Sequence, residues 1–362
     1  MNFASSITKA TQEARSERRP RLLVVDDSVV IRSVIERIVT GQGELSVAAK
    51  TANIPAAISY LRDNQVDVIL LDHEMPGITG IDALPEILSV AQGARVAILS
   101  GHCAAGSESA VRALALGASD VIAKPGIRDY DAGFADMLVK RLLRLAAPAL
   151  MGQQEEEGVT LRPISAGFRL SCLGIGASTG GIHALAQLLE NKKVALDVPI
   201  LVTQHLPEAF IPYFAMQLAR MTDVPVKIAE HGERLHANHI YVAPGHANLL
   251  CVRGPRGLVM ADLKPQRASA LDPLPSLNPM FTAMAKTYGR GAAAIILTGM
   301  GRDGTAGAKA IAAADGLVIA QDRESSVIWG MPGHAAQSGL ASALLPPAQM
   351  IDYLGAFCGV AP

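Results

Sequence analysis

A serine at position 178 stands where an apolar run ends, glycines follow and a helical segment begins. The pentapeptide around it, Gly176-Ala177-Ser178-Thr179-Gly180, fits the pattern G-x-S-x-G. Many hydrolases use this pattern for the sharp strand-to-helix turn that exposes a nucleophilic hydroxyl. The same serine could instead only cap the helix, because a serine oxygen accepts hydrogen bonds from the free N–H groups at a helix start. The pentapeptide alone leaves both functions open.

A serine nucleophile needs a base that takes its proton and a third group that orients the base. The sequence holds nine histidines, and His205 directly follows the apolar run 198–204. We expect that run to be the strand beside the one that carries Ser178. His183 lies one turn into the helix after Ser178 and His246 follows the segment YVAPG, so both are weaker candidates for the base.

Asp303 is the candidate for the third group. It follows the apolar run 292–298 within the segment GMGRDG, although an aspartate there could also be the N-cap of a helix over 305–314. The glycines favour the chemical alternative, because they let backbone N–H groups approach a substrate oxygen. Serine, histidine and aspartate would then open on one crevice at the carboxyl ends of parallel strands. Their chain order differs from the Ser-Asp-His order of the α/β-hydrolases.

A dinucleotide site is the competing interpretation of the glycines before the serine. Gly174-Ile175-Gly176 begins the pattern G-x-G-x-x-G, but its sixth position is Thr179. The next expected strand ends in Gln204 rather than in an acid that could bind a ribose. Both departures argue against a dinucleotide.

Polar side chains also end four apolar runs in the first part of the chain. They are Asp26 and Asp27 after the first run, Asp72 after the third, Ser100 after the fourth and Lys124 after the fifth. Clustered carboxylates repel one another unless a cation joins them, and such oxygen ligands suit Mg²⁺, which also accepts a phosphoryl oxygen. The lysine could place its positive charge on the same phosphoryl group. Each residue alone could equally be an ordinary polar residue at a strand end.

The elements that must position these residues follow from an alternation of apolar runs and helical stretches. Five β/α units fill residues 21–145, which indicates a parallel sheet covered by helices on both faces. A second α/β pattern fills residues 169–362, and its adjacent runs at 248–263 look like a hairpin. We therefore expect a doubly wound, mostly parallel second domain with an antiparallel edge hairpin. Residues 146–168 form the expected linker, with two prolines and three consecutive glutamates.

Composition bounds the function further. The chain has 362 residues, enough for two domains, with a net charge of −1 and only 4% aromatic residues. We therefore expect no nucleic-acid partner. No apolar run approaches the ~20 residues of a membrane span, and residues 1–20, which resemble a flexible polar tail, lack a secretory signal. The four cysteines form no C-x-x-C pair, so we expect neither disulfides nor zinc but a reducing cytoplasm: Cys103, Cys172, Cys251 and Cys358.

The first site has the motifs of a known family. VVDDS, LLDHEMPGITG, ILSGH and VIAKP resemble the motifs of a response-regulator receiver domain. The resemblance implies a flavodoxin-like fold and phosphorylation by a histidine kinase. Val121 stands where the family has an aromatic switch residue, a departure that bears on how phosphorylation is read out. The resemblance assigns Asp72 as phosphoacceptor, Asp26, Asp27 and Asp72 as Mg²⁺ ligands, and Ser100 and Lys124 as phosphoryl contacts.

The second part of the chain resembles the catalytic domain of the chemotaxis protein-glutamate methylesterases, the CheB family. The motifs are GIGASTGG, QHLPEAF, YVAPG, ILTGMGRDG and AQDRESSVIWGMP, and the receiver in front completes the family's two-domain order. Leu274 and Asn278 replace charged residues of the family's R-P-S-x-D segment, and Asn248 stands where a histidine is common. The resemblance implies Ser178 as nucleophile, His205 as base, Asp303 as orienting acid, and Thr179 with Gly299, Met300 and Gly301 around the oxyanion.

The resemblance also implies an activity and its partners. The expected reaction is hydrolysis of glutamate γ-methyl esters on methyl-accepting chemoreceptors with release of methanol, together with deamidation of receptor glutamines. A chemotaxis-type histidine kinase would supply the phosphoryl group, and the unphosphorylated receiver would partly cover the cleft. Mg²⁺ would serve only the receiver, and the esterase would need no cofactor. We expect a cytoplasmic protein, recruited to membrane receptor arrays without inserting. The alternatives are a receiver-gated hydrolase of another ester and a non-catalytic regulator that docks on receptors.

Overall fold

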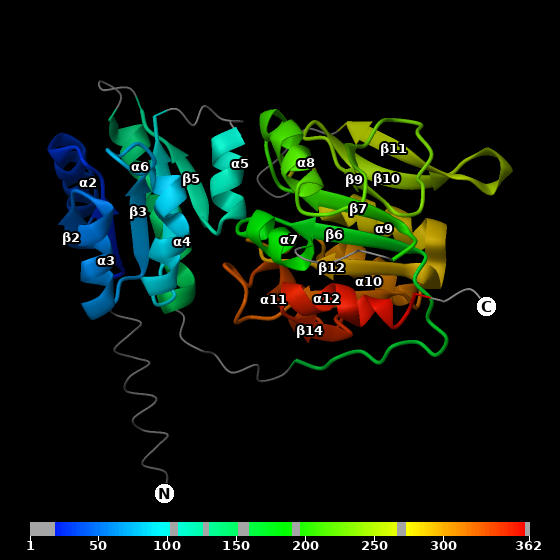
Figure 1. The fold of residues 1–362 in the computed structure, drawn as a ribbon. Coiled ribbons are helices and arrows are strands. Elements are labelled where there is room, and N and C mark those ends of the chain that lie inside the picture. The colour runs from blue at the N-terminus through cyan, green and yellow to red at the C-terminus, as the bar shows by residue number, and fades with distance from the viewer. Residues whose placement is uncertain are drawn as a thin grey trace, which may run out of the picture. The chain divides into compact units, whose positions relative to one another are not determined.

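The computed structural model describes residues 19–101, 108–125, 130–150, 159–189, 196–265 and 273–358 (Figure 1). The expected tail over 1–20 and the expected linker over 146–168 lie partly outside these residues, and Cys103 lies wholly outside them. The chain divides into two compact units, the first comprising Met1–Ala104 with Arg112–Glu157 and the second Ala105–Val111 with Gly158–Pro362.

The first unit is a parallel five-stranded sheet between two layers of helices. Its strand order is β2-β1-β3-β4-β5, and alternate strand residues face opposite layers. Leu23 and Val25 join the apolar cluster that contains α3 and α4 residues, whereas Leu22 and Val24 join the cluster with α2 and α6. The strands are β1 Arg21–Val25, β2 Ser46–Thr51, β3 Val68–Asp72, β4 Arg95–Ser100 and β5 Asp120–Ala123; the helices are α2 Val29–Gln42, α3 Ile54–Asp63, α4 Gly80–Val90, α5 Glu108–Ala115 and α6 Ala132–Leu150.

Three helices of this unit begin at short polar side chains. Ser28 Oγ accepts from Ile31 N at 3.3 Å before α2, and Asn53 Oδ1 accepts from Ala56 N at 2.9 Å before α3. Thr79 does the same for α4. Each cap satisfies an N–H group that the helix itself leaves free, so the sequence fixes where these helices start.

The second unit is a parallel seven-stranded sheet of order β14-β13-β12-β6-β7-β9-β8. β6 has β7 on one side and β12 on the other, so the order of the chain reverses at β6 and opens a crevice at the carboxyl ends of these strands. The strands are β6 Cys172–Ala177, β7 Pro199–Gln204, β8 Val226–Ile228, β9 His239–Val242, β12 Ala292–Ile296, β13 Leu317–Gln321 and β14 Ala343–Leu345. The helices are α7 Gly181–Leu189, α8 Ile211–Ala219, α9 Leu277–Tyr288, α10 Thr305–Ala313, α11 Met331–Gln337 and α12 Pro347–Gly355, with 3₁₀ turns η1 Glu208–Phe210, η2 Pro255–Gly257 and η3 Gly289–Gly291.

The expected hairpin is present, formed by β10 Ala247–Arg253 and β11 Val259–Pro265. The expected fold class is confirmed, but the hairpin is a two-stranded sheet of its own rather than the edge of the larger sheet. β8 takes the edge position beside β9, and the hairpin instead contributes Leu249, Cys251 and Ala261 to the apolar cluster around α9.

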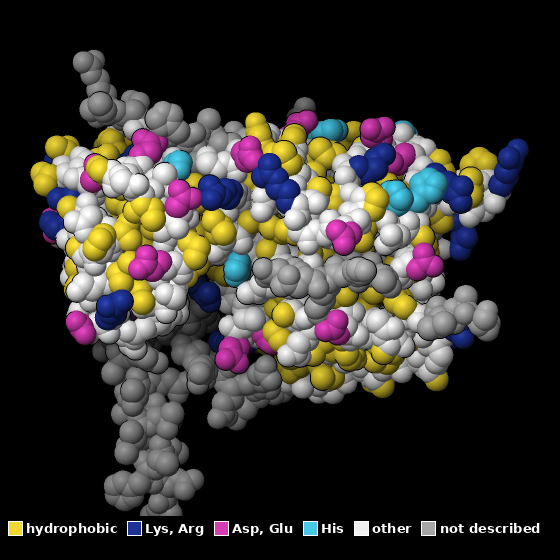
Figure 2. Space-filling view, in the orientation of Figure 1, with side chains coloured by type: hydrophobic (Ala, Val, Ile, Leu, Met, Phe, Trp, Pro, Cys, Tyr) yellow, Lys and Arg dark blue, Asp and Glu magenta, His cyan; other side chains and the backbone are white. Residues whose placement is uncertain are grey.

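The surface matches the balanced charge of the chain. Basic and acidic side chains are interspersed on the face shown in Figure 2. In the described part of the chain, no helix is both long and apolar enough to cross a membrane.

Candidate functional site

The turn after β6 holds Ser178 by three backbone contacts. Ser178 N donates to Thr298 O at 3.0 Å, and Ser178 O accepts from Gly181 N at 2.8 Å and from Gln204 Nε2 at 2.9 Å. Gly180 has a φ of +76°, and a Cβ on it would lie 2.4 Å from Val327 Cγ2. The glycine is therefore required twice, by the left-handed backbone and by the lack of space, and the serine is fixed in the turn between the end of β6 and the start of α7.

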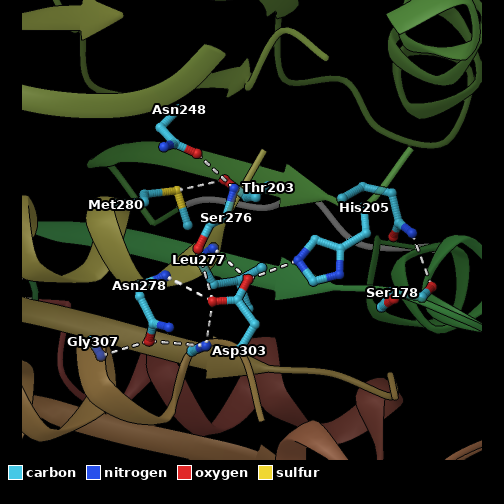
Figure 3. Close-up of polar contacts among 12 residues, drawn as sticks. Ser178, Thr203, His205, Asn248, Ser276, Leu277, Asn278, Met280, Asp303 and Gly307 are labelled. Carbon is cyan, nitrogen blue, oxygen red and sulfur yellow. Dashed lines mark hydrogen bonds and ion pairs between the residues drawn. The ribbon is translucent and has the colours of Figure 1, made fainter. Parts of the chain in front are cut away.

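His205 and Asp303 meet at the same crevice. His205 follows β7, where its N–H donates to Ala177 O at 3.0 Å, and its Nε2 lies 2.7 Å from Asp303 Oδ2. In the view of Figure 3 the imidazole lies between the Asp303 carboxylate and Ser178. Among the described residues no hydrogen bond joins the Ser178 hydroxyl to His205, and catalytic hydrogen bonds are often long before substrate binds. We call these three residues the serine site.

Asp303 is buried, with 8% of its surface exposed. Besides His205, its carboxylate accepts hydrogen bonds from Ser276 Oγ and Leu277 N, both at 2.8 Å, and from Gly304 N at 2.9 Å. Burial acts to raise the pKa of Asp303, but the hydrogen bonds from His205, Leu277 and Ser276 outweigh it and lower that pKa. Asp303 is therefore held as a carboxylate.

The amino end of α9 supplies most of these donors, and the sequence analysis did not include it in the site. Ser276 is the N-cap of α9, so Asp303 lies where the free N–H groups and the helix dipole favour a negative charge. Two of the noted departures lie here. Asn278 Oδ1 accepts from Gly304 N at 3.1 Å and Gly307 N at 2.9 Å, and Asn248 Oδ1 accepts from Ser276 N at 2.7 Å (Figure 3).

The glycine-rich loop after β12 approaches the serine closely. A Cβ on Gly299 would lie 2.6 Å from Ser178 Cβ, and Gly299 N already donates to Ile328 O at 3.0 Å. Gly299 thus serves close packing, which makes its N–H the least suited of the loop's donors to bind a substrate oxygen. Met300 is 51% exposed and Gly301 has a φ of +81°. Thr179, the residue that follows the serine in the chain, is half-buried.

The polar strand ends of the first unit also come together. Asp26, Asp27 and Asp72 each offer an oxygen within 4.8 Å of the others. Lys124 Nζ lies 2.7 Å from Asp72 Oδ1 and 3.2 Å from Asp26 Oδ2. We call these four residues the acidic pocket. Ser100, at the end of β4, is fully buried and its Oγ lies 3.0 Å from His73 Nδ1, a contact that the sequence analysis did not anticipate.

Electrostatics fit a cation in the acidic pocket. Burial raises the pKa of Asp72 to about 6, against the opposing hydrogen bond from Lys124. Burial acts to lower the pKa of Lys124, but its hydrogen bond to Asp72 and the charge of Asp26 raise that pKa. Asp26 and Asp72 thus share one ammonium group and Asp27 adds a third carboxylate nearby, and oxygen ligands of this kind suit Mg²⁺. Val121, at the expected switch position, packs against the apolar cluster of α3 and α4.

The two units and their sites define a class of protein, in which a receiver-type domain precedes an α/β domain that carries serine, histidine and aspartate at its switch point. Comparison with known families agrees: residues 22–132 match the response regulator receiver domain and residues 173–354 match CheB methylesterase. The chain belongs to the CheB methylesterase family.

Individual relatives cover nearly the whole chain. A protein-glutamate methylesterase/protein-glutamine glutaminase of Rhodospirillum rubrum is 34% identical over 96% of this chain and 98% of its own. One of Nitrobacter hamburgensis is 36% identical over 92% and 93%. The crystal structure of the Thermotoga maritima CheB methylesterase catalytic domain is 34% identical, covers 51% of this chain and 97% of its own, and superposes with a TM-score of 0.49.

Proposed function

We propose that this chain is a phosphorylation-activated protein-glutamate methylesterase and protein-glutamine glutaminase. It hydrolyses glutamate γ-methyl esters on chemoreceptors with release of methanol, and it deamidates receptor glutamines. The observation that carries the proposal is the 2.7 Å contact between His205 and Asp303 at the strand ends that flank Ser178. The names of the full-length relatives support the same substrate.

The hydrogen bonds of the serine site suggest the path of the proton. An ionised carboxylate only accepts hydrogen bonds, so Asp303 fixes the imidazole proton on Nε2 and leaves the Nδ1 lone pair of His205 as the base. Nδ1 takes the proton of Ser178 as Oγ attacks the ester carbonyl carbon. His205 then returns this proton to the leaving methoxide, and methanol departs from the acyl-enzyme.

Water completes the reaction by the same steps. His205 takes a proton from water, the hydroxide attacks the acyl carbon, and the proton returns to Ser178 Oγ as the free glutamate leaves. With a glutamine substrate, ammonia is the first leaving group. We assign the oxyanion to backbone N–H groups around Thr179, Met300 and Gly301, where one such donor lowers the barrier by about 2.7–4 kcal/mol. Gly299 brings the loop close enough to do this.

The acidic pocket regulates this chemistry in our proposal. Asp72 accepts a phosphoryl group from a chemotaxis-type histidine kinase, and Ser100 and Lys124 contact that group. Asp26, Asp27 and Asp72 would hold Mg²⁺, which when bound offsets their negative charge and accepts a phosphoryl oxygen. We place the receiver domain at residues 21–145 and the methylesterase domain at 169–362, and we propose that the protein acts in the cytoplasm beside membrane receptor arrays.

Methanol release from methyl-labelled receptor membranes tests the proposal. We expect wild type to release methanol faster with a small acyl phosphate as phosphodonor, Ser178→Ala to release none, and Asp72→Ala to keep a basal rate that does not respond. Exposed residues supply matched controls, and Ser338→Ala and Asp63→Ala should behave as wild type. No release by wild type would refute the esterase, and equal rates with and without phosphodonor would refute activation.

A further inference from the structure

We propose that Asn248 and Asn278 are positioning residues for the serine site, two neutral amides that fix the amino end of α9 so that it holds Asp303 as a carboxylate aimed at His205. The inference rests on the proposed function and deepens it. Both residues replace side chains that the family resemblance leads one to expect, and neither contacts Ser178 or His205 in the hydrogen bonds of the described residues. Their effect passes through Asp303.

Asn278 and Asp303 cap each other's helices. Asp303 Oδ1 accepts from Asn278 N at 3.3 Å, one residue into α9. In return Asn278 Oδ1 accepts from Gly304 N and Gly307 N at the start of α10. The amino ends of α9 and α10 are therefore joined through two side chains, and neither helix can shift along its axis without breaking a cap of the other.

Asn248 fixes the same helix end from the hairpin. It lies on β10, is 2% exposed, and accepts from Ser276 N at 2.7 Å. Ser276 in turn donates its hydroxyl to Asp303 Oδ1 at 2.8 Å. A continuous chain of contacts thus runs from Asn248 through Ser276 and Asp303 to His205 (Figure 3).

An uncharged side chain at position 278 suits this geometry, in contrast to the aspartate of the family's R-P-S-x-D segment. Gly304 N donates both to Asn278 Oδ1 at 3.1 Å and to Asp303 Oδ1 at 2.9 Å, so the two oxygens share one hydrogen-bond donor. An aspartate at 278 would put a second carboxylate there, and close carboxylates favour protonation of one of them. Among the described residues His205 is the titratable side chain that bonds to Asp303. The remaining partners are the Ser276 hydroxyl and the N–H groups of Leu277, Asn278 and Gly304.

The test is the pH dependence of kcat/KM for methanol release from methylated receptor, measured without phosphodonor so that phosphorylation of Asp72 does not contribute. We expect Asn278→Asp to move the acidic limb of the profile to higher pH by about one unit, because the added negative charge favours protonation of one of the two neighbouring carboxylates. Asn278→Ser, a neutral cap, should keep the wild-type limb. Asn248→Ala should lower kcat by about tenfold with little change in KM. The variant loses the hydrogen bond from Ser276 N, so Asp303 is held less firmly, but no group that contacts substrate is changed.

Asn53→Asp is the matched control, since Asn53 caps α3 of the first unit in the same way, and it should leave the pH profile unchanged. All variants are first compared with wild type by thermal unfolding. A folded Asn278→Asp enzyme with the wild-type limb, or a folded Asn248→Ala enzyme with wild-type kcat, would overturn the positioning role. Wild type that releases no methanol would instead refute the proposed function, so the two failures are distinct.

Discussion

Replacing Asp303 by asparagine removes one negative charge from the serine site while keeping the size of the side chain. In the proposed mechanism His205 becomes positive when it takes the proton of Ser178, and Asp303 Oδ2 lies 2.7 Å from its Nε2. Two unit charges with centres about 4 Å apart interact by about 4 kcal/mol at an effective dielectric constant near 20. Losing this stabilisation in the transition state should lower kcat by roughly 10³-fold.

The hydrogen bonds around Asp303 add to that loss. An asparagine amide NH₂ in the place of Oδ2 would face two donors, Leu277 N and the protonated Nε2 of His205. The imidazole would then favour the tautomer with its proton on Nδ1, where the base is needed. In a serine protease the equivalent change costs about 10⁴-fold in kcat, so we expect a loss between 10³-fold and 10⁴-fold for Asp303→Asn.

The assay is the initial rate of methanol release at saturating methylated receptor. KM should stay near the wild-type value, because Asp303 is buried behind His205 and does not face substrate in the proposed mechanism. Asp315→Asn, which changes an exposed aspartate of the same unit, should have wild-type activity. A folded Asp303→Asn protein that loses less than tenfold in kcat would refute the reasoning, because Asp303 would then neither orient nor stabilise the base.

Three further predictions concern packing and ionisation. Gly299→Ala should lower both kcat and the melting temperature, since its Cβ would lie 2.6 Å from Ser178 Cβ and overpacking costs about 1–3 kcal/mol; an alanine variant with wild-type melting and activity would contradict this contact. Asp72 has a pKa of about 6 in the fold against an ordinary 3.8, so the folded unit binds the proton more tightly and loses roughly 2 kcal/mol of stability as pH rises from about 4 to about 6. Urea unfolding at several pH values without Mg²⁺, monitored through hydrogen exchange in β3, measures this loss, and Asp72→Asn should abolish it. If the variant showed the same dependence of stability on pH, another titratable group would be responsible. Burial raises the pKa of Cys251 to about 12 and that of Cys172 well above its usual value, so a thiol reagent should label both only after denaturation, as read by mass spectrometry, and rapid labelling of the native protein would contradict their burial.

Much of the fold follows from local signals in the sequence. Apolar runs predict the longer strands, and Ser178, His205 and Asp303 all follow such runs. The parallel sheet then brings the three ends to one crevice. The two three-residue strands, β8 and β14, were not predicted because runs of this length carry no periodicity. Because β8 pairs with β9 at the edge of the seven-stranded sheet, the hairpin does not occupy that edge as the sequence had suggested.

The support of Asp303 could not be predicted from the sequence. Ser276 and Asn278 lie more than twenty residues before Asp303, and their contacts depend on how α9 packs against α10. Ser276 does precede the helical segment from Leu277, a signal that predicts a helix start but not that an acid from another helix would occupy it. The role of Gly299 could not be predicted from the sequence either. A glycine at this position suggested a backbone N–H that is free to bind a substrate oxygen, whereas in the structure the missing side chain lets Gly299 approach Ser178 closely.

The central claim is that Ser178 forms a covalent ester with a receptor glutamyl group, and rapid acid quenching tests it most directly. Enzyme and methylated receptor are mixed with phosphodonor, quenched within the first turnovers and digested, and the peptide that carries Ser178 is examined by mass spectrometry. The mechanism predicts a receptor glutamyl fragment bound to Ser178 Oγ in wild type and none in Ser178→Ala. Methanol release without any adduct on Ser178, or with the adduct on another side chain, would contradict the account.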